Sequence, residues 1–359
     1  MSNASAQPHG VMEGKGSYNK HAQLPAGGAA LAMPLLEKAI QSLEFDPREQ
    51  HIVIADYGSS QGKNSMVPMQ VAIRGLRRRF GPNRAISVFH IDQPSNDFAT
   101  LFAVLDSDPD RYVLNEPHVF PAVIGRSFYE RVLPPDHVDL GWSSYAAMWL
   151  SRIPTQITGH FRMDCGTDAE VAVCRRQAAQ DWESFLSLRA KELRPGGRLV
   201  IVLAGLDDDG ASGLQDLMDH ANGVVADMVS EGTIRADERK QMVLGTYPRR
   251  KCELLAPFDR DGQFQGLTVE CCELSQLADP SWADYEHDRD AEALATKRAR
   301  LFRAIFAPSL SCALGDAGTS HRFAERLEDG LKQRLLNQRT PVHTFVQTMI
   351  LAKATPCLS

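Results

Sequence analysis

The chain has 359 residues, enough for one large domain or two modest ones, and its apolar share of 43% and charged share of 23% are ordinary for a globular protein. The formal net charge of −6 argues against nucleic acid as a partner, because phosphate binding requires a basic surface. No run approaches the roughly 18 apolar residues of a membrane span, and the first residues lack the pattern of a signal peptide, so we expect no membrane partner.

The first third of the chain predicts an alternation of helices and strands. Residues 1–16 are rich in Gly, Ser and Asn and are expected to be mobile until something orders them. Apolar residues at helical spacing predict a helix over 29–43, and the run HIVIADYG over 51–58 is typical of a buried parallel strand. A second helix over 67–80 and a second strand over 85–92 continue the pattern.

The same alternation runs through the rest of the chain. Residues 118–125, 137–142 and 197–205 predict the third, fourth and fifth strands. A helix over 177–193, ended by a Pro-Gly-Gly triplet, precedes the fifth strand, and residues 342–353 predict a late strand. Strands that alternate with helices indicate an α/β fold with a doubly wound, mostly parallel sheet.

Three stretches interrupt this alternation. Residues 151–176 and 207–245 are polar, helical or irregular and carry no strand signal, and residues 284–338 are strongly helical. We interpret them as a helical cap over the ligand end of the sheet. The α/β core then comprises 1–150, 177–206, 246–283 and 339–359.

The cysteines suit neither a disulfide framework nor a metal site. There are seven of them, an odd number, and none is spaced as C-x-x-C. The adjacent pair Cys271 and Cys272 fits no zinc motif. We therefore expect reduced, buried thiols, no bound metal and a cytoplasmic protein.

A cofactor signature follows the first predicted strand. The segment DYGSSQG, residues 56–62, stands between that strand and a helix, and its small residues allow a tight turn close to a ligand. Asp92 ends the second strand, where a carboxylate can accept both hydroxyls of a ribose. The G-x-G-x-x-G of a dinucleotide site is missing, and Asp56 suits an ammonium group better than a pyrophosphate. The alternative is an ordinary strand-to-helix turn with a solvated aspartate.

Seven segments of the chain occur together in the order of a known family. The strings SSYAAMWLS and DQPSNDF are the most specific of them. The segments are MEGKGSY (12–18), IADYGSSQGKN (54–64), FHIDQPSNDF (89–98), GRSFYERVLP (125–134), SSYAAMWLSRIP (143–154), LRPGGRLV (193–200) and MVSEG (228–232). With them the chain resembles the SABATH family, the plant carboxyl methyltransferases of salicylate, benzoate, jasmonate and indole-acetate, together with the caffeine N-methyltransferases.

The resemblance implies a class I, Rossmann-like methyltransferase fold, S-adenosylmethionine as the cofactor and a homodimer. Asp92 would hold the ribose hydroxyls, and Phe128 would stack on the adenine, although an aromatic residue at that position is otherwise read as core. Tyr18 and Asn64 would approach the methionine part of the cofactor. The cofactor residues that the resemblance implies are Tyr18, Asp56, Gly58, Ser59, Asn64, Asp92, Gln93, Ser127 and Phe128.

The resemblance places the acceptor site around Trp149. Its indole N–H is a donor without a competing acceptor function, which suits one oxygen of a carboxylate. In purine methylators of the family a histidine stands at the position of Met148, so Met148 favours an acid. The acceptor residues implied are Gln23, Tyr145, Met148, Trp149, Met218, Tyr247 and Phe302, with Leu217, Ile305 and His343 at further pocket positions.

The chain departs from the family at the substrate clamp. Without gaps, Ala22 and Pro25 fall at the usual Ser and Gln, and proline has no N–H or side-chain donor. Either Gln23 substitutes through a local shift or the substrate is held differently, and His21 is a further candidate donor.

The expected reaction is O-methylation of a small apolar acid, whether aromatic, indolic or terpenoid, to its methyl ester. A carboxylic acid with a reference pKa of roughly 4 is already ionised near pH 7, so no catalytic base is expected. A ring nitrogen or a phenol as the acceptor is the alternative within enzymology, and a phenol would need a base, for which His21 and His343 are the candidates. A catalytically inactive cofactor-binding relative is the alternative from another class.

Overall fold

The computed structural model describes residues 10–45, 49, 51–258 and 261–355. Its centre is an eight-stranded sheet in the order β3-β2-β1-β4-β5-β8-β7-β6. The first five strands in this order run parallel, whereas β8, β7 and β6 are antiparallel to their neighbours. The strands are β1 (His51–Tyr57), β2 (Ala85–Asp92), β3 (Val119–Gly125), β4 (Val138–Ser144), β5 (Leu193–Ala204), β6 (Gln263–Phe264), β7 (Leu267–Leu277) and β8 (Thr344–Lys353).

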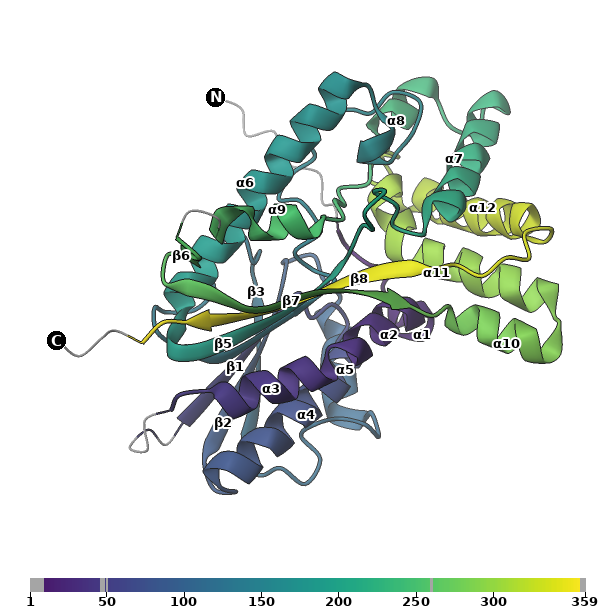
Figure 1. The fold of residues 1–359 in the computed structure, drawn as a ribbon. Helices are drawn as coiled ribbons and strands as arrows, with labels where there is room; N and C mark the ends of the chain where they lie inside the picture. The colour runs from purple at the N-terminus through teal and green to yellow at the C-terminus, as the bar shows by residue number, and fades with distance from the viewer. Residues whose placement is uncertain (1–9, 46–48, 50, 259–260, 356–359) are drawn as a thin grey trace.

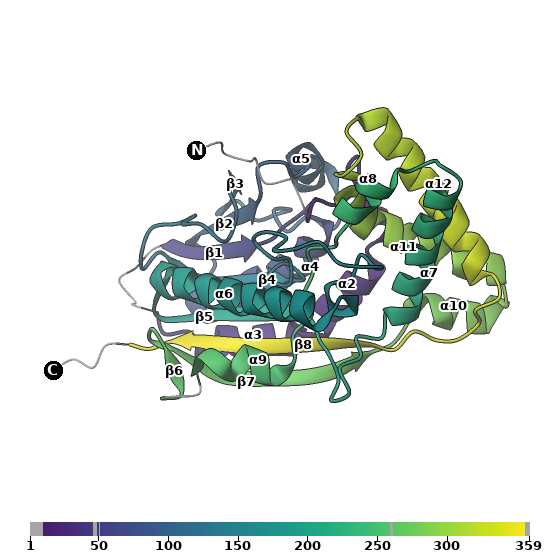
Figure 2. The same ribbon diagram turned by 90° about the horizontal axis from the view of Figure 1, so that it is seen from above.

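Helices cover both faces of the sheet and one of its ends. In Figure 1, α3, α4 and α5 lie below the sheet, α6 and α9 lie above it, and α7, α8, α10, α11 and α12 gather beyond the end of the strands. Figure 2 shows the same helical layer from above. The helices are α1 (Ser17–His21), α2 (Gln23–Leu31), α3 (Met33–Ser42), α4 (Lys63–Phe80), α5 (Phe98–Ser107), α6 (Asp168–Glu192), α7 (Gln215–Ser230), α8 (Ala236–Gln241), α9 (Lys251–Leu255), α10 (Pro280–Asp288), α11 (Ala291–Ser311) and α12 (Ala317–Leu335).

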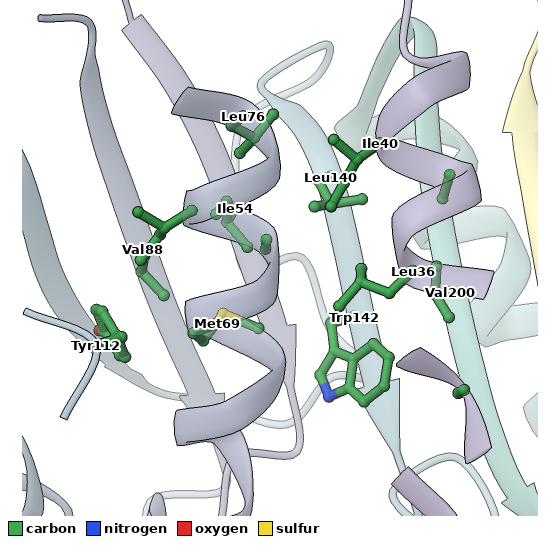
Figure 3. Packing of buried hydrophobic residues seen from close by; sticks show 14 of the residues in the cluster. Leu36, Ile40, Ile54, Met69, Leu76, Val88, Tyr112, Leu140, Trp142 and Val200 are labelled. Atoms are coloured by element: carbon green, nitrogen blue, oxygen red, sulfur yellow. The ribbon is translucent and has the colours of Figure 1, made fainter. Parts of the chain in front are cut away.

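Three apolar clusters bind these layers together. The largest joins α3 and α4 to the sheet, and Figure 3 shows Leu36 and Met69 packing toward Ile54 and Trp142. A second lies between α6 and the opposite face of the sheet. The third joins α7, α11 and α12 around Phe302 and is separate from the sheet. The helical layer therefore has an apolar core of its own.

The predicted parallel sheet is confirmed, and three of the predicted elements differ in their bounds. The chain forms α2 and α3 where one helix was predicted over 29–43, because the backbone breaks at Ala32. Strand β5 begins at Leu193, so the Pro-Gly-Gly triplet lies inside the strand, where a register shift lets β5 pair with Val138. Helix α4 begins at Lys63 and includes Pro68.

Sequence reasoning missed the strand β7 and the start of α6. The sequence of β7 is interrupted by Glu270, Glu273 and Ser275, and most of its side chains are partly buried or exposed, so no apolar run marks it. Helix α6 begins at Asp168, inside a stretch predicted as cap, because Thr167 and Glu170 form a capping box.

The prediction of buried thiols is wrong. Six cysteines lie in the described part of the chain, and all are free, but only Cys174 is buried. Cys165 and Cys252 are exposed on surface segments, which no local pattern forbids. Cys357 and the predicted mobility of residues 1–9 lie outside the described residues. None of the described helices is both long and apolar enough to cross a membrane.

Candidate functional site

A cavity opens where the parallel strands end, and we name it the main cavity. Gly58, Asp92 and Ser127 follow or end β1, β2 and β3 on one side, and Trp149 and Ile305 lie on the other. Counted with its open mouth it encloses about 1200 Å³. The main cavity therefore lies between the loops that follow the parallel strands and the helical layer.

At the strand end of the main cavity, two backbone groups hold the carboxylate of Asp92. Its Oδ2 accepts from the N–H of Ser60 at 2.7 Å, and its Oδ1 accepts from the N–H of Gln93 at 2.8 Å. Burial raises the pKa of Asp92 to about 6, against the lowering effect of these two N–H groups. Each oxygen keeps a free lone pair, so the carboxylate can accept two more hydrogen bonds, as a diol would donate them.

The loop after β1 is shaped by left-handed backbone. Gly58 has a φ of 93° and Ser60 a φ of 47°. A Cβ at Gly58 would overlap the Cβ of Ala146, so only glycine fits there. The hydroxyls of Ser59 and Ser60 are buried and have no hydrogen-bond partner among the described residues. Ser60, not the predicted Ser59, lines the main cavity, because the turn at Ser60 directs the backbone toward Asp92.

Aromatic and amide side chains complete this half of the cavity. Phe128 lines it and contacts Tyr129, with 4.8 Å between the ring centroids. The carbonyl of Phe128 accepts from the buried Arg189 at 2.9 Å, which fixes the segment after β3. Asn96 also lines the cavity and donates to the carbonyl of Ser60 at 2.8 Å. Sequence reasoning missed Ser60 and Asn96, although both lie in segments that carry the resemblance.

Asp56 lies beneath the loop rather than at the cavity wall. Its Oδ2 accepts from the hydroxyl of Ser65 at 2.6 Å and is 2.8 Å from Nδ1 of His90. The other ring nitrogen of His90 is 2.9 Å from the hydroxyl of Tyr112. These buried groups occupy one oxygen of the carboxylate, so Asp56 supports the loop and has no direct contact with the cavity.

Tyr18 reaches the main cavity from α1. Burial raises its pKa to about 12, and its hydroxyl is hydrogen-bonded to the side chain of Asn64. Asn64 itself does not line the cavity; its amide lies 3.5 Å from the carbonyl of Ala22. The predicted pair is thus brought together, with Tyr18 in front and Asn64 behind.

The acceptor half is built on a turn after β4. Tyr145, Met148 and Trp149 all line the main cavity, although they lie on a turn and not on one face of a helix. Tyr145 has a φ of 55°, uncommon for a bulky residue, and its N–H donates to the carbonyl of Val202 at 2.8 Å. A Cβ at Gly28 would overlap the hydroxyl of Tyr145. The glycine on α2 therefore makes room for the tyrosine.

Trp149 offers the polar group that stands out in this half. Its ring is buried against Phe306, with 6.2 Å between the centroids, and Gly10 packs on its face. The hydroxyl of Tyr129 donates to the carbonyl of Trp149 at 2.8 Å and fixes the backbone. The indole Nε1–H has no acceptor among the described residues, whereas that of Trp182 donates to the carbonyl of Leu254 at 3.0 Å. Trp149 thus keeps an unused donor at the cavity wall.

Four predicted acceptor residues do not line the main cavity: Met218, Phe302 and Tyr247, and Gln23, which is described below. Met218 and Phe302 belong to the core of the helical layer, and Leu217 and Leu301 line the main cavity in their place. A helix turns by about 100° per residue, so an alignment shift of one position exchanges the two faces. The hydroxyl of Tyr247 donates to Glu253 at 2.7 Å, away from the cavity.

The positions of Pro25 and Gln23 on α2 show which side chain stands where a substrate-clamping glutamine is expected. Pro25 is buried and lines the main cavity, whereas Gln23 is exposed and lines a neighbouring cavity together with His21. Gln23 therefore does not replace the missing glutamine in this structure, because it lies on another side of α2. His343 lines neither of these cavities, while Leu217 and Ile305 line the main cavity as expected.

The described residues hold no group of three His, Cys, Asp or Glu side chains arranged for a metal ion. The main cavity thus presents the carboxylate of Asp92, which can accept from both hydroxyls of a diol, the aromatic ring of Phe128 and the indole donor of Trp149. Such an arrangement can bind a nucleoside at the strand end and hold an acidic group near Trp149.

A search of known proteins identifies relatives along nearly the whole chain. A family model described as SAM dependent carboxyl methyltransferase matches residues 7–354. Methyltransferase LUC1 of Fusarium sp is 32% identical over 246 residues, which are 66% of this chain and 63% of that protein. The match thus spans slightly less than two thirds of the length of this fungal relative. Gibberellic acid methyltransferase 2 of Arabidopsis thaliana is 25% identical over 337 residues, 87% of this chain and 86% of that protein.

Among solved structures, the fold is close to that of a loganic acid methyltransferase with SAH. The two superpose with a TM-score of 0.79 at 21% identity, over 97% of this chain and 100% of the other. At that identity the likeness shows the fold, which is that of a class I methyltransferase with a mostly parallel sheet.

Proposed function

Since the chain belongs to the SAM-dependent carboxyl methyltransferases, we propose that it transfers the methyl group of S-adenosylmethionine to a carboxylate oxygen of a small, largely apolar acid. The single observation that carries this proposal is the free indole N–H of Trp149 at the wall of the main cavity. At the opposite end of this cavity, the carboxylate of Asp92 can accept hydrogen bonds from a ribose diol.

The residues present fit the cofactor. Asp92 has one free lone pair on each oxygen for a ribose diol, and Phe128 provides an aromatic face beside it. The partnerless hydroxyls of Ser59 and Ser60 lie in the loop that would meet the methionine part. When bound, the cofactor supplies an electrophilic methyl group on its sulfonium.

The protein's own residues bind and align. Trp149 would donate to one oxygen of the acid, and the other oxygen would attack the methyl carbon in line from about 3–3.5 Å. Met148, Leu217 and Ile305 form the apolar wall that receives the body of the acid and excludes water. The carboxylate is already ionised, so no residue has to remove a proton.

The wall of the main cavity disfavours a phenolic acceptor. No histidine lines it within the described part of the chain, and the two candidate bases, His21 and His343, both lie elsewhere. Burial raises the pKa of Tyr145 well above its ordinary value, so this hydroxyl is no base near neutral pH either. A carboxylate, which needs none, is the acceptor that these residues suit.

We propose that residues 151–176, 207–245 and 284–338 act as the cap, because the core of α7, α11 and α12 covers the acceptor end independently of the sheet. A cytoplasmic homodimer is part of the same proposal. The free cysteines fit a reducing compartment. Light scattering on the purified protein tests the dimer.

The activity is tested with methyl-tritiated S-adenosylmethionine and a panel of aromatic, indolic and terpenoid acids. A labelled methyl ester releases its label as methanol in mild alkali, whereas an N-methyl group or an aryl ether keeps it. We expect alkali-labile label from at least one acid and none from the amide of that acid. Label that is stable to alkali would contradict carboxyl methylation.

A further inference from the structure

The main cavity borders a second one, which we name the side cavity. Four leucines line both cavities: Leu24 on α2, Leu214 and Leu217 at the start of α7, and Leu301 on α11. The two spaces are therefore separated by these apolar side chains. Leucine side chains can change rotamer, so a long acid held at Trp149 would reach the side cavity by passing between them.

The charged residues that line the side cavity are mostly cationic. Lys20, Lys297 and Arg298 line it, against the single carboxylate of Asp279. His21 also lines it, and burial together with Arg300 lowers the pKa of this histidine, so it is a neutral donor or acceptor near pH 7. The acceptor half of the main cavity, by contrast, is mostly apolar.

The carboxylate of Asp279 is paired with a cationic side chain of the protein itself. It lies 2.6 Å from the guanidinium of Arg298, and both side chains are more than nine-tenths buried. Asp279 also accepts from the N–H of Ser281 at 3.0 Å and from that of Val342 at 3.2 Å. The pair of Asp279 and Arg298 is therefore a neutral, rigid floor, and the net charge of the wall comes from the lysines.

Both lysines are available to a ligand. Lys297 pairs with Asp284 at 2.7 Å, but both partners are substantially exposed, so the pair contributes little and can be exchanged. Lys20 is exposed, and its ammonium group has no partner among the described residues. Two lysines that line a cavity bordered by leucines suit a carboxylate.

From this geometry, and resting on the function proposed above, we infer that the substrate is an elongated dicarboxylic acid. One carboxylate lies at Trp149, the chain passes the four leucines, and the second carboxylate meets Lys20 and Lys297. Methyl transfer breaks the bond between sulfur and the methyl carbon and forms one between that carbon and an oxygen of the carboxylate at Trp149. The sulfur keeps the electron pair, no proton moves, and the product is a half ester.

The substrate class is tested with a length series of α,ω-dicarboxylic acids and of straight-chain monocarboxylic acids of equal length. We expect one range of lengths in which kcat/KM for the diacid exceeds that for the monoacid by about tenfold, mainly through KM, since two ion pairs at exposed lysines can together supply this much although each is weak. Mass spectrometry should find the monomethyl ester and no diester.

The lysines are tested by the ratio of the two kcat/KM values. In Lys20→Met combined with Lys297→Met, the preference for the diacid should fall to about onefold. Lys38→Met, an exposed lysine on α3 outside both cavities, is the matched control and should keep the ratio of the unaltered protein. Replacing both lysines by Glu should transfer the preference to an ω-amino acid of the same length.

The possible failures are distinguishable. If monoacids and diacids are methylated equally well at every length, the dicarboxylate inference is wrong while carboxyl methylation stands. If the ratio survives the loss of both lysines, the side cavity does not hold the second carboxylate. If the protein binds S-adenosylmethionine but methylates no acid of either series or of the panel above, the proposed function fails and the inference fails with it.

Discussion

The two ends of the main cavity are built in different ways. At the cofactor end, polar groups at fixed positions of the sheet are held by short hydrogen bonds, as between Asp92 and the N–H groups of Ser60 and Gln93. At the acceptor end, most of the wall is apolar, and Trp149 adds one donor. Hydrogen-bonded groups tolerate no replacement, whereas an apolar wall can exchange side chains of similar size. A family with this design can keep one cofactor and change its acid.

The largest effect is expected at the cofactor end. Asp92→Ala removes the acceptor of two ribose hydroxyls, and no neighbouring carboxylate replaces it, because Asp56 faces Ser65 and His90. Binding of S-adenosylmethionine should weaken by about 2–3 kcal/mol, measured by calorimetry. Asp110→Ala, at an exposed aspartate outside the cavity, is the control. A folded Asp92→Ala protein with unchanged affinity would remove this residue from the site.

The acceptor end is expected to depend on Trp149 almost as strongly. Trp149→Phe keeps an aromatic plane but deletes the free N–H, so kcat/KM for the acid should fall by about 1.5–3 kcal/mol. Affinity for S-adenosylmethionine should hardly change, because the groups proposed to bind ribose and adenine lie at the other end of the cavity.

Trp282→Phe is the matched control for Trp149→Phe, because it deletes an indole N–H on α10, outside both cavities. If both substitutions leave kcat/KM intact for every accepted acid, the indole of Trp149 only packs in the core. The donor at the acceptor end must then be another residue.

A glycine at the boundary of the two ends should matter for stability. In Gly28→Ala the new methyl group would overlap the hydroxyl of Tyr145, which is already held in a left-handed conformation. We expect a loss of about 1–3 kcal/mol in the free energy of unfolding, as for other overpacked sites, measured by urea denaturation.

The adjacent Gly27→Ala serves as the control for Gly28→Ala. Its Cβ would meet only a methyl group of Leu277 at 3.3 Å, and alanine is about 1 kcal/mol better than glycine inside a helix. This substitution should be neutral or stabilising. Equal effects of the two alanines would show that Tyr145 moves aside freely.

Acid pH should weaken the cofactor end alone. The pKa of Asp92 is raised to about 6 by burial, so its carboxylate is ionised at pH 7.5 and becomes protonated as the pH falls through 6. If only the ionised form binds the diol well, affinity for S-adenosylmethionine at pH 5 should be about tenfold lower, or about 1.4 kcal/mol. Calorimetry between pH 5 and 8 measures this. A flat profile would show that a protonated Asp92 serves equally well.

The fold was predictable where one physical signal dominates. Buried parallel strands are continuous apolar runs, so β1, β2 and β5 were visible in the sequence. Strand β7 lies toward the antiparallel edge and carries two glutamates and a serine, so its pairing with β8 comes from the sheet around it and not from its own pattern. The exposed Cys165 and Cys252 likewise follow from tertiary placement, which residue type alone does not fix.

Some residues of the candidate site were also predictable from the sequence, and others were not. Asp92 and Gly58 line the main cavity, as predicted, because the end of a strand and a glycine turn fix their positions. Ser60 was missed for Ser59, because a left-handed turn at a serine leaves no mark in the sequence. Met218 and Phe302 were predicted to line the cavity, but they lie on a neighbouring face of their helices, in the core of the helical layer. Apolar residues on two faces of a buried helix cannot be told apart by sequence.

The position of Pro25 offers a way to shift the acceptor end toward its relatives. Pro25 is buried at the wall of the main cavity, in the first turn of α2, where a helix accepts proline or any other residue without losing an internal hydrogen bond. The chain therefore gives up a side-chain donor at a place where its backbone does not require proline. A glutamine there would present an amide to the carboxylate held by Trp149.

Pro25→Gln is accordingly expected to improve binding, and to be the smallest of these effects. A hydrogen bond to a charged group is worth about 1.5–3 kcal/mol, and ordering the long glutamine side chain consumes roughly 1–2 kcal/mol of it, which leaves about 0.5–1.5 kcal/mol in KM for a small acid. Pro25→Met has the same shape without the amide and is the control, so a gain shared by both variants would reflect packing. If KM rises in Pro25→Gln alone, the amide displaces the acid, and the acid carboxylate approaches Trp149 from a direction that leaves no space for a second donor on α2.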